Sequence, residues 1–406
     1  MLRRALLQKG EKEMDEKKAS LSRVTNRRKR RRLKKVYRRI LLGIIFIIIV
    51  SSAYSLLKPE KSAVVTTSEH ERKESVISEK QLVEVQSDVD ASIKISAAGD
   101  FTLGMDENFE YNGSFVHTAS MNGLSYFLEG LNDVFKEDDL TTVNLETTLT
   151  NATEKAEKTF RFKGDPEYAQ ILKLGGIEAV NLANNHIFDY KQKGYEDTIE
   201  ALKEKEVGYF GYENQFITTI KEVKIGALGY EGWEDTAEIR STIEKDIQSL
   251  REQGVQIVLI HFHWGDEKHY VPNEDQKSLA RFSIDAGADL ILGHHPHVLQ
   301  GIEEYNGKFI VYSLGNFMFG GNKNPSDKDT FVFQQTFHIE NGELSDKKEI
   351  NVIPFSISSV SSHNDYQPTL LSGGEYERVK DKIIHYSNQV KGSDWIVYDT
   401  EEEVTE

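Results

Sequence analysis

From about residue 91 onward, short apolar runs alternate with longer segments whose apolar residues recur every three or four positions. Runs of about four to eight apolar residues predict strands, and the periodic segments predict amphipathic helices. The expected strands are 93–97, 141–146, 178–183, 223–230, 256–260 and 289–292. The expected helices are 166–174, 191–206, 236–253 and 273–286. Strands that alternate with helices in this way are typical of an α/β fold with a largely parallel sheet.

The pattern changes beyond residue 300, where strand-like segments are joined by turns rather than by helices. These segments are 309–314, 331–339 and 349–357. They predict a second, more antiparallel sheet that packs on the first. After about residue 359 the pattern weakens. A helix is expected over 376–390, and a disordered acidic tail is expected over 399–406.

Ahead of the folded region lies an apolar segment with a basic flank. Arg27 to Arg39 is a nearly unbroken basic block, residues 40–57 are uncharged and mostly apolar, and Lys58 follows. About 18 apolar residues are enough to span the hydrocarbon core of a membrane. The positive-inside rule places the basic flank in the cytoplasm. We therefore expect a single transmembrane helix in the cell membrane, with the main domain extracytoplasmic. A cleaved signal peptide is the alternative, although the basic region is long for one.

The formal net charge of −16 hides a strong asymmetry along the chain. Residues 1–39 hold 17 Lys and Arg against 4 Asp and Glu, and the remainder holds 33 against 62. The apolar segment that follows explains the basic block better than nucleic-acid binding does, so no nucleic-acid partner is expected. The chain has no cysteine, which excludes disulfides, thiolate catalysis and Cys-bound zinc.

These features divide the chain into five expected segments. Residues 62–90 are polar, charged and aperiodic, as a flexible spacer is. The segments are a basic cytoplasmic segment (1–39), a transmembrane anchor (40–57), an extracytoplasmic linker (58–92), the main domain (93–358) and a C-terminal extension with an acidic tail (359–406).

Polar side chains of a restricted kind follow the apolar strands, at the points where the strands are expected to end. They are carboxylates, amides and imidazoles, and they belong to Asp100, Glu146, Asn185, His186, His261, His263, His295, His297 and Asn316. Strand ends are where α/β folds place their sites. These groups are ligands for a divalent metal such as Mn²⁺, Fe or Zn²⁺, and they suffice for one or two ions. Taken singly, such a residue can also serve as a turn residue, a helix cap or a solvated surface group.

The segment 289–298 is the centre of this pattern. After an apolar run broken by a glycine, His295 and His297 stand two residues apart, so both can face one way as a pair of metal ligands. Strand alternation turns His294 away from His295, and we expect His294 to be exposed. Trp264, after another apolar strand, is expected to line the pocket or to stack on a substrate.

Other polar residues bear on the same site. Asp189 can orient the ring of His186 through a hydrogen bond, or it can cap the helix that follows. Lys158, Arg161 and Lys163 lie between two of the motif strands, where they can rim the site or belong to a solvated strand. The main domain is strongly acidic, so capture of a polyanion by long-range attraction is not expected.

Several motifs occur together and in order along the chain. They are Gly99-Asp100, Asn144-Leu145-Glu146, Leu182-Ala183-Asn184-Asn185-His186, His263-Trp264-Gly265, Gly293-His294-His295-Pro296-His297 and Ser313-Leu314-Gly315-Asn316-Phe317. Over about residues 93–358 the chain resembles the CapA/PgsA-type family of bacterial poly-γ-glutamate capsule biosynthesis proteins. The resemblance implies a calcineurin-like, metallophosphoesterase-related fold, which is a two-sheet α/β/β/α sandwich.

The resemblance also implies roles for individual residues. The implied metal ligands are Asp100, Glu146, Asn185, His261, His295 and His297. The implied catalytic residue is His186, as an acid or electrostatic stabiliser near the leaving group, with Asp189 beside it.

The chain departs from the metallophosphoesterase pattern at two positions. Thr102 stands where an Asp-x-His motif usually has its histidine, and the bridging carboxylate is Glu146 rather than an aspartate.

Three functional hypotheses follow. In the first, the chain is a membrane-anchored extracytoplasmic protein that assists synthesis or export of poly-γ-glutamate or a related anionic polymer. It would use its metal site beside other membrane subunits of capsule synthesis. In the second, it is an independent metal-dependent phosphoesterase or other hydrolase at the cell surface. In the third, it is a binding module that has kept the fold and lost catalysis.

Overall fold

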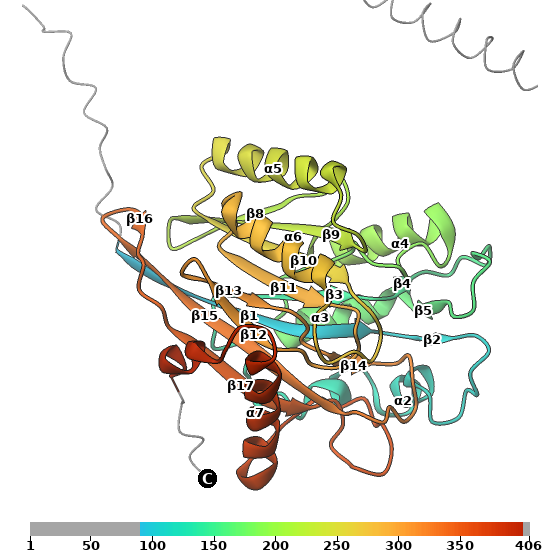
Figure 1. The fold of residues 1–406 in the computed structure, drawn as a ribbon. Coiled ribbons are helices and arrows are strands. Elements are labelled where there is room, and N and C mark those ends of the chain that lie inside the picture. Colours follow the sequence, from blue (N-terminus) through green and yellow to red (C-terminus); the bar gives the residue numbers. More distant parts are fainter. Residues whose placement is uncertain (1–89, 401–406) are drawn as a thin grey trace, which may run out of the picture. The chain divides into compact units, whose positions relative to one another are not determined.

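The computed structural model describes residues 90–400, and two β-sheets form its centre (Figure 1). The first sheet has the strand order β18-β17-β15-β1-β3-β6-β7, with β14 also paired to β1 and β16 to β15. Its strands are β1 (Ala91–Thr102), β3 (Leu140–Leu145), β6 (Ala179–Asn181), β7 (Gly208–Phe210), β14 (Asn316–Phe319), β15 (Asp329–Glu340), β16 (Glu343–Leu344), β17 (Ile350–Ser356) and β18 (Thr369–Leu370).

The second sheet has the order β12-β13-β11-β10-β9-β8. Its strands are β8 (Phe216–Ile220), β9 (Val223–Gly232), β10 (Ile257–Trp264), β11 (Leu290–His294), β12 (Ile302–Tyr305) and β13 (Lys308–Val311). A small third sheet joins β2 (Met105–Asp106), β4 (Thr148–Leu149) and β5 (Phe162–Gly164). Both large sheets contain parallel and antiparallel pairs, so the expectation of an α/β fold is confirmed and the sheets are mixed.

Helices cover the outer faces of the sheets, with one exception. They are α2 (Phe115–Asn122), α3 (Ala169–Gly175), α4 (Lys191–Glu204), α5 (Ala237–Glu252), α6 (Glu274–Asp285) and α7 (Gly373–Asn388), with short 3-10 turns η1 (Ser125–Leu128), η2 (Pro166–Tyr168) and η3 (Asp394–Tyr398). The exception is α7, which packs against β17 of the first sheet and β12 of the second. Leu172 of α3 and Leu202 of α4 share a buried cluster with Val143 of the first sheet. Ile243 of α5 shares another with Val258 of the second sheet. The layers are therefore α/β/β/α.

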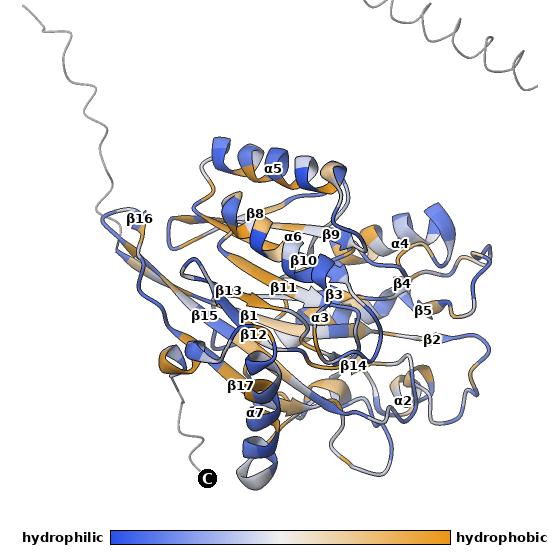
Figure 2. Cartoon of the chain, viewed as in Figure 1, coloured by the Kyte–Doolittle hydropathy of each residue, from blue (hydrophilic) through white to orange (hydrophobic). Residues whose placement is uncertain are grey.

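The core between the two sheets is built by strand alternation. Leu259 of β10 and Leu292 of β11 face Ile95 of β1 and Phe333 of β15, and all four side chains are fully buried. Figure 2 shows these central strands as apolar, while the outer surface of α5 is hydrophilic. Because the carboxyl ends of the parallel strands in both sheets point to one edge, polar residues at those ends meet there.

The C-terminal strands are not arranged as predicted. They do not form a separate antiparallel sheet. β15 pairs antiparallel with β1, from Ala91 opposite Ile339 to Ala97 opposite Phe333, and β17 continues from β15. β13 instead joins β11 of the second sheet. The division between sheets falls earlier, between β7 and β8, so the βα units themselves are shared between the two sheets. Strand periodicity reports which face is buried but does not report which partner covers it.

Residues of the segment 359–400 contribute to the core between the sheets. The helix expected over 376–390 is α7, and Val379 and Ile383 of α7 lie in the core between the sheets with Trp395 of η3. All three side chains are fully buried. Lys380 forms a buried ion pair with Asp399, which fixes the end of the described chain against β17.

The predicted transmembrane anchor over 40–57, its basic flank, nearly all of the linker and residues 401–406 of the acidic tail lie outside the described residues. Between residues 90 and 400, no helix has the length and apolar character needed to cross a membrane.

A substitution at Gly99 tests how tightly β1 packs against the loop before β14. A Cβ atom at Gly99 would lie 2.0 Å from the carbonyl oxygen of Gly315. This is a backbone atom, so it cannot move away without a shift of the chain. We expect Gly99→Ala to lower the free energy of unfolding by about 2–4 kcal/mol, as overpacking at a rigid contact does. Gly374→Ala is the matched control, because a Cβ there meets nothing within 4 Å. Urea unfolding of both variants gives the comparison, and equal stabilities would contradict the close-packing argument.

Candidate metal centre

The site lies at the edge where the parallel strands of both sheets end. In the first sheet, Asp100 of β1 is in register with Asn144 of β3 and with Asn316 of β14. Glu146 follows β3 directly, and its backbone N–H donates to the carbonyl of Phe101 at 2.8 Å. In the second sheet, β10 and β11 bring histidines to the same edge, with His263 paired opposite His294. Segments far apart in the sequence thus converge on a single group.

Glu146 is the residue that most needs an explanation. Its side chain is completely buried, and neither carboxylate oxygen accepts a hydrogen bond from the described residues. Oε1 instead faces three imidazole nitrogens: Nε2 of His263 at 3.5 Å, Nε2 of His297 at 3.8 Å and Nε2 of His186 at 3.9 Å. Burial raises the pKa of Glu146 well above its usual value, against the opposing charge of His297. Burying a carboxylate that has no hydrogen-bond partner costs free energy unless a bound cation compensates its charge.

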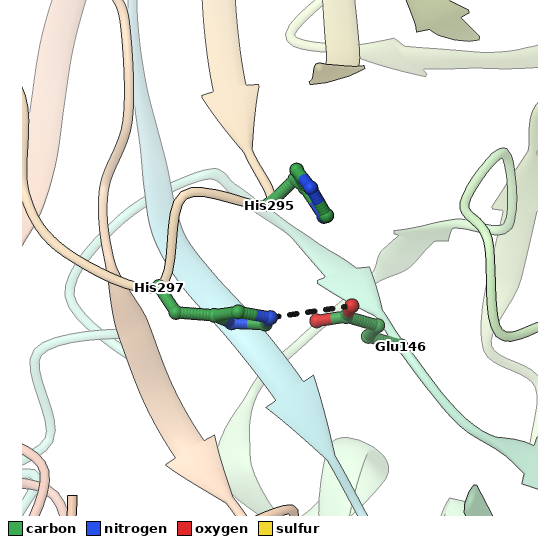
Figure 3. A group of neighbouring side chains, drawn as sticks. All are labelled: Glu146, His295 and His297. Atoms are coloured by element: carbon green, nitrogen blue, oxygen red, sulfur yellow. Dashed lines mark ion pairs between the residues drawn. The ribbon is translucent and has the colours of Figure 1, made fainter. Parts of the chain in front are cut away.

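The spacing of these atoms fits a bound ion. Two ligand atoms that share a divalent metal at about 2.1 Å each lie roughly 3.0–3.4 Å from one another in octahedral or tetrahedral geometry. The separations around Glu146 are slightly larger than this and exceed hydrogen-bond length. Glu146, His295 and His297 each offer one ligand atom, and these atoms all lie within 4.8 Å of one another (Figure 3). The residues present therefore fit a divalent cation.

His297 is held in place by Asn316. The side-chain amide of Asn316 donates to the carbonyl of His297 at 3.1 Å, so its oxygen is left to accept from Nδ1 of His297 at 2.9 Å. This fixes the proton on Nδ1 and turns Nε2 toward Glu146, as outer partners of metal-binding histidines do. Burial alone would lower the pKa of His297, but the charges of Glu146 and Asp100 outweigh it and raise the pKa to about 10.

His295 and Asp100 complete this side of the group. The backbone N–H of His295 donates to Asp100 at 3.3 Å, and Nδ1 of His295 is buried without a hydrogen-bond partner among the described residues. Burial lowers the pKa of His295 to about 4. Burial would raise the pKa of Asp100, but hydrogen bonds with His294 and His297 outweigh it and hold the pKa well below its usual value. Asp100 is thus the carboxylate that stays ionised.

Asn185 and His263 form the other side of the group. Oδ1 of Asn185 lies 3.0 Å from Nε2 of His263, which is also the separation of two neighbouring ligands on one ion. The ligand-type atoms therefore follow one another in a row from Asn185 through His263 and Glu146 to Nε2 of His297, and Asp100 lies 3.4 Å from the other ring nitrogen of His297. Glu146 stands in the middle of this row.

His261, a predicted ligand, does not lie in the group. Its Nε2 is 3.0 Å from Oγ1 of Thr142 and its Nδ1 is 2.8 Å from Nε2 of His294, so both nitrogens have protein partners. The reason is the length of β10, which runs to Trp264 and not to residue 260. His261 therefore sits below the edge, and His263, two residues further along the same face, reaches it.

Two predictions about neighbouring residues are wrong. His294 is completely buried rather than exposed, because it ends β11 on the face that looks between the sheets. The backbone then turns, with a positive φ of 95° at His295, and strand alternation no longer applies. Trp264 does not line the site, since it is buried on the helix side of its sheet and donates to the carbonyl of Tyr312. Trp233 takes that place, with its ring centroid 4.7 Å from that of His295.

His186 and Asp189 are arranged as an oriented pair. Nδ1 of His186 donates to Asp189 at 2.6 Å, and Lys158 donates to the other carboxylate oxygen at 2.7 Å. The ring of His186 lies against Phe162, with centroids 4.3 Å apart. Burial lowers the pKa of His186, against the effect of its hydrogen bond with Asp189. The ring is therefore held with Nε2 toward Glu146 and is favoured in its neutral form.

Of the three basic residues that were expected to rim the site, Lys158 alone contacts its residues. Lys158 also donates to the carbonyl of Asn185 at 2.7 Å, and its side chain is 30% exposed. Arg161 donates to the carbonyl of Lys158, and Lys163 lies over the ring of Tyr190. The latter two support the loop rather than the site.

A set of asparagines beneath the site was missed by sequence reasoning. Oδ1 of Asn144 accepts from Asn181 and from Asn184, and its nitrogen donates to Asp100 at 2.8 Å. Asn184 also donates to the carbonyl of Leu145. These amides link three strand ends by hydrogen bonds and fix the orientation of the Asp100 side chain. The available signal was the presence of asparagine inside otherwise apolar strands, at 144 and 181.

Comparison with known proteins agrees with this arrangement of motifs. The family model described as "Bacterial capsule synthesis protein PGA_cap" matches residues 94–321. The capsule biosynthesis protein CapA of Bacillus anthracis is 32% identical over 231 residues, which cover 51% of this chain and 54% of that protein. The PGA biosynthesis protein CapA of Bacillus subtilis (strain 168) is 30% identical over 229 residues, covering 51% of this chain and 60% of that protein. The chain thus spans about half the length of the curated relatives it matches.

Two solved structures are also similar. A hypothetical protein from Thermus thermophilus has a TM-score of 0.42 at 15% identity, covering 64% of this chain and 99% of that one. A phosphatase from Mycoplasma pneumoniae has a TM-score of 0.40 at 16% identity, covering 65% of this chain and 94% of that one. These TM-scores are too low to bear on function. The family match does identify the family, because it extends over more than half of the chain and includes the residues of the strand-end group. The motif-based resemblance is confirmed, and the chain belongs to the bacterial capsule synthesis protein PGA_cap family.

Proposed function

We propose that this chain assists the synthesis or export of poly-γ-glutamate or a related anionic polymer, through a site for one or two divalent metal ions. The observation that carries the metal site is Glu146, a fully buried carboxylate whose oxygens have no hydrogen-bond partner among the described residues and face imidazole nitrogens. The family match and the names of the CapA relatives support the polymer. The α/β/β/α layers with ligands at strand ends also suit the metallophosphoesterase-like fold that the motifs imply.

In this proposal the residues divide by position. Asp100 and His297 would hold an ion on one side of Glu146, Asn185 and His263 would hold one on the other, and Glu146 would be shared. His295 lies between, with its ring centroid 4.8 Å from that of His263. A divalent metal such as Mn²⁺, Fe or Zn²⁺ lowers the pKa of a bound water and polarises a phosphoryl or acyl oxygen when it is present.

The remaining residues would handle the proton and the substrate. Nε2 of His186 faces the group while Asp189 binds the proton on its other nitrogen, so the neutral ring would first accept a proton at Nε2. The imidazolium formed, paired with Asp189, would then give that proton to a leaving group. Lys158 forms an ion pair with Asp189 and is partly exposed. It would offer positive charge to a carboxylate or phosphate of the substrate. The bond cleaved would be a γ-glutamyl amide or a phosphate ester.

We also propose that residues 40–57 anchor the chain in the cell membrane with the main domain extracytoplasmic, beside other membrane subunits of capsule synthesis. The support is the apolar segment itself and the basic block that precedes it, both of which lie outside the described residues.

Glu146→Gln separates metal binding from folding. Glutamine keeps the size and shape of Glu146 and removes the negative charge that burial disfavours. We expect the metal-free variant to match the wild type in stability within about 1 kcal/mol. Added Mn²⁺ at about 100 times its dissociation constant should stabilise the wild type by about 2.7 kcal/mol and leave the variant unchanged. Thermal unfolding with and without metal measures this, and an equal gain in both proteins would refute the assignment of Glu146.

The double variant His295→Ala, His297→Ala tests the site as a whole. We expect elemental analysis to find about one to two metal ions per wild-type chain and fewer than about 0.2 in the variant. Hydrolysis of aryl phosphate esters and of γ-glutamyl amides should fall at least about 100-fold with the metal. His363→Ala, an exposed histidine far along the chain from the site, is the control and should behave as wild type. A wild-type protein without metal, even after incubation with Mn²⁺, Fe²⁺ and Zn²⁺, would leave only the binding-module hypothesis.

Removal of residues 1–57 tests the anchor. We expect the full chain to sediment with membranes and to be released by detergent but not by high salt, because burial of about 18 apolar residues is not screened by ions. The shortened chain should stay in the supernatant. Release of the full chain by salt alone would contradict an integral anchor.

A further inference from the structure

A cavity of about 640 Å³ adjoins the candidate metal centre at the end of β9, and nothing in the proposed function uses it. We call it the Trp233 pocket. Its aromatic walls are Tyr212, Tyr230 and Trp233, and its acidic walls are Glu231, Glu234 and Glu238. No Lys, Arg or His is among the residues that line it in the described part of the chain. Aromatic faces combined with carboxylates are the walls that proteins use for organic cations.

The pocket and the metal centre share a wall. The ring of Trp233 stands edge-on to His295, with centroids 4.7 Å apart, and to His263, with centroids 5.7 Å apart. Glu231 is the partner of His263 in the parallel register of β9 and β10, so the two side chains leave the sheet on the same face. Tyr212 donates to the carbonyl of Asn184 at 3.2 Å. A ligand in the pocket therefore lies next to the ligand-type residues.

Nearby positive charges are paired or offset within the protein. Lys158, whose charge acts on Glu231, is paired with Asp189 at 2.7 Å. The N-terminus of α5 borders the pocket, but Oγ1 of Thr236 accepts from the backbone N–H of Ile239, and Glu238 stands in the first turn. Both features offset the positive end of the helix dipole. Arg240, on the next turn, is paired with Asp235 at 2.6 Å. The field inside the pocket is therefore negative.

Glu231 is the partly buried carboxylate of the pocket. Its carboxylate has lost part of its water and would gain from a cation. Trp233 is 40% exposed, so its ring is open to a ligand on the side away from the histidines. A carboxylate beside an accessible indole ring is suited to a primary ammonium group.

We propose that the Trp233 pocket binds a primary ammonium group, the free amino end of a γ-linked glutamate chain, and so presents that end of the chain to the metal centre. This rests on the proposed function. Every residue of such a polymer carries a free carboxylate, which the acidic walls repel, and the amino-terminal residue alone offsets that charge with an ammonium group. The site would then act at a chain end and would not bind the middle of the polymer through this pocket.

Binding of two small peptides to the full chain tests the inference. The probes are γ-linked tetraglutamate with a free amino end and the same peptide with that end acetylated. We expect wild-type protein to bind the free peptide about tenfold more tightly by calorimetry. Glu231→Gln should reduce this preference to less than about threefold. Glu244→Gln, an exposed glutamate of α5 outside the pocket, should keep the wild-type preference.

The same titrations are run on metal-free and metal-loaded protein, with metal content measured in each sample. Equal affinity for the two peptides, a failure of both to bind, or an unchanged preference in Glu231→Gln would each overturn the ammonium pocket. A wild-type protein that discriminates the peptides but holds no metal would support the pocket while refuting the metal centre. The two proposals therefore fail separately.

Discussion

Two carboxylates, Asp100 and Glu146, are fully buried between the ends of two sheets, and the surrounding structure is arranged around that constraint. Moving an ionised carboxylate out of water costs several kcal/mol unless hydrogen bonds or opposite charges compensate it. Asp100 receives that compensation from an asparagine, two histidines and a backbone N–H. Glu146 receives none as a hydrogen bond from the described residues. The same edge of the fold thus holds one carboxylate that is satisfied by the protein and one that is left for a cation.

This difference explains why the supporting residues are amides. An asparagine can donate with its nitrogen and accept with its oxygen, so Asn144 can bind Asp100 while it accepts from two further asparagines. Asn316 does the same for His297, accepting from its ring and donating to its backbone. Because amides carry no charge, they fix geometry without competing with an ion for the carboxylates.

Much of the fold and of the site could be predicted from the sequence. The alternating pattern located most helices and strands, and the strand-end rule brought Asp100, Glu146, Asn185, His295 and His297 to one place. The errors share one physical cause, since apolar periodicity marks where a strand is buried but not where its last hydrogen bond lies. β10 continues past residue 260 to Trp264, so His263 lies at the edge of the sheet where His261 was predicted. Trp233 lies in a loop after β9 that carries no periodic signal.

The segment after residue 358 has a consequence for the order of folding. The core between the sheets contains Val379, Ile383 and Trp395, and β1 at the start of the domain pairs with β15 more than 230 residues later. A chain made from its N-terminus onward cannot close that core until Trp395 has emerged, so the edge of β1 and the apolar inner faces of the sheets stay unpaired until then. The βα units that carry Asp100 and Glu146 are thus synthesised well before the residues that complete their core. A chain whose synthesis stops at the end of the family match, near residue 321, would lack the residues that close the core and would be a substrate for quality control rather than a smaller functional domain.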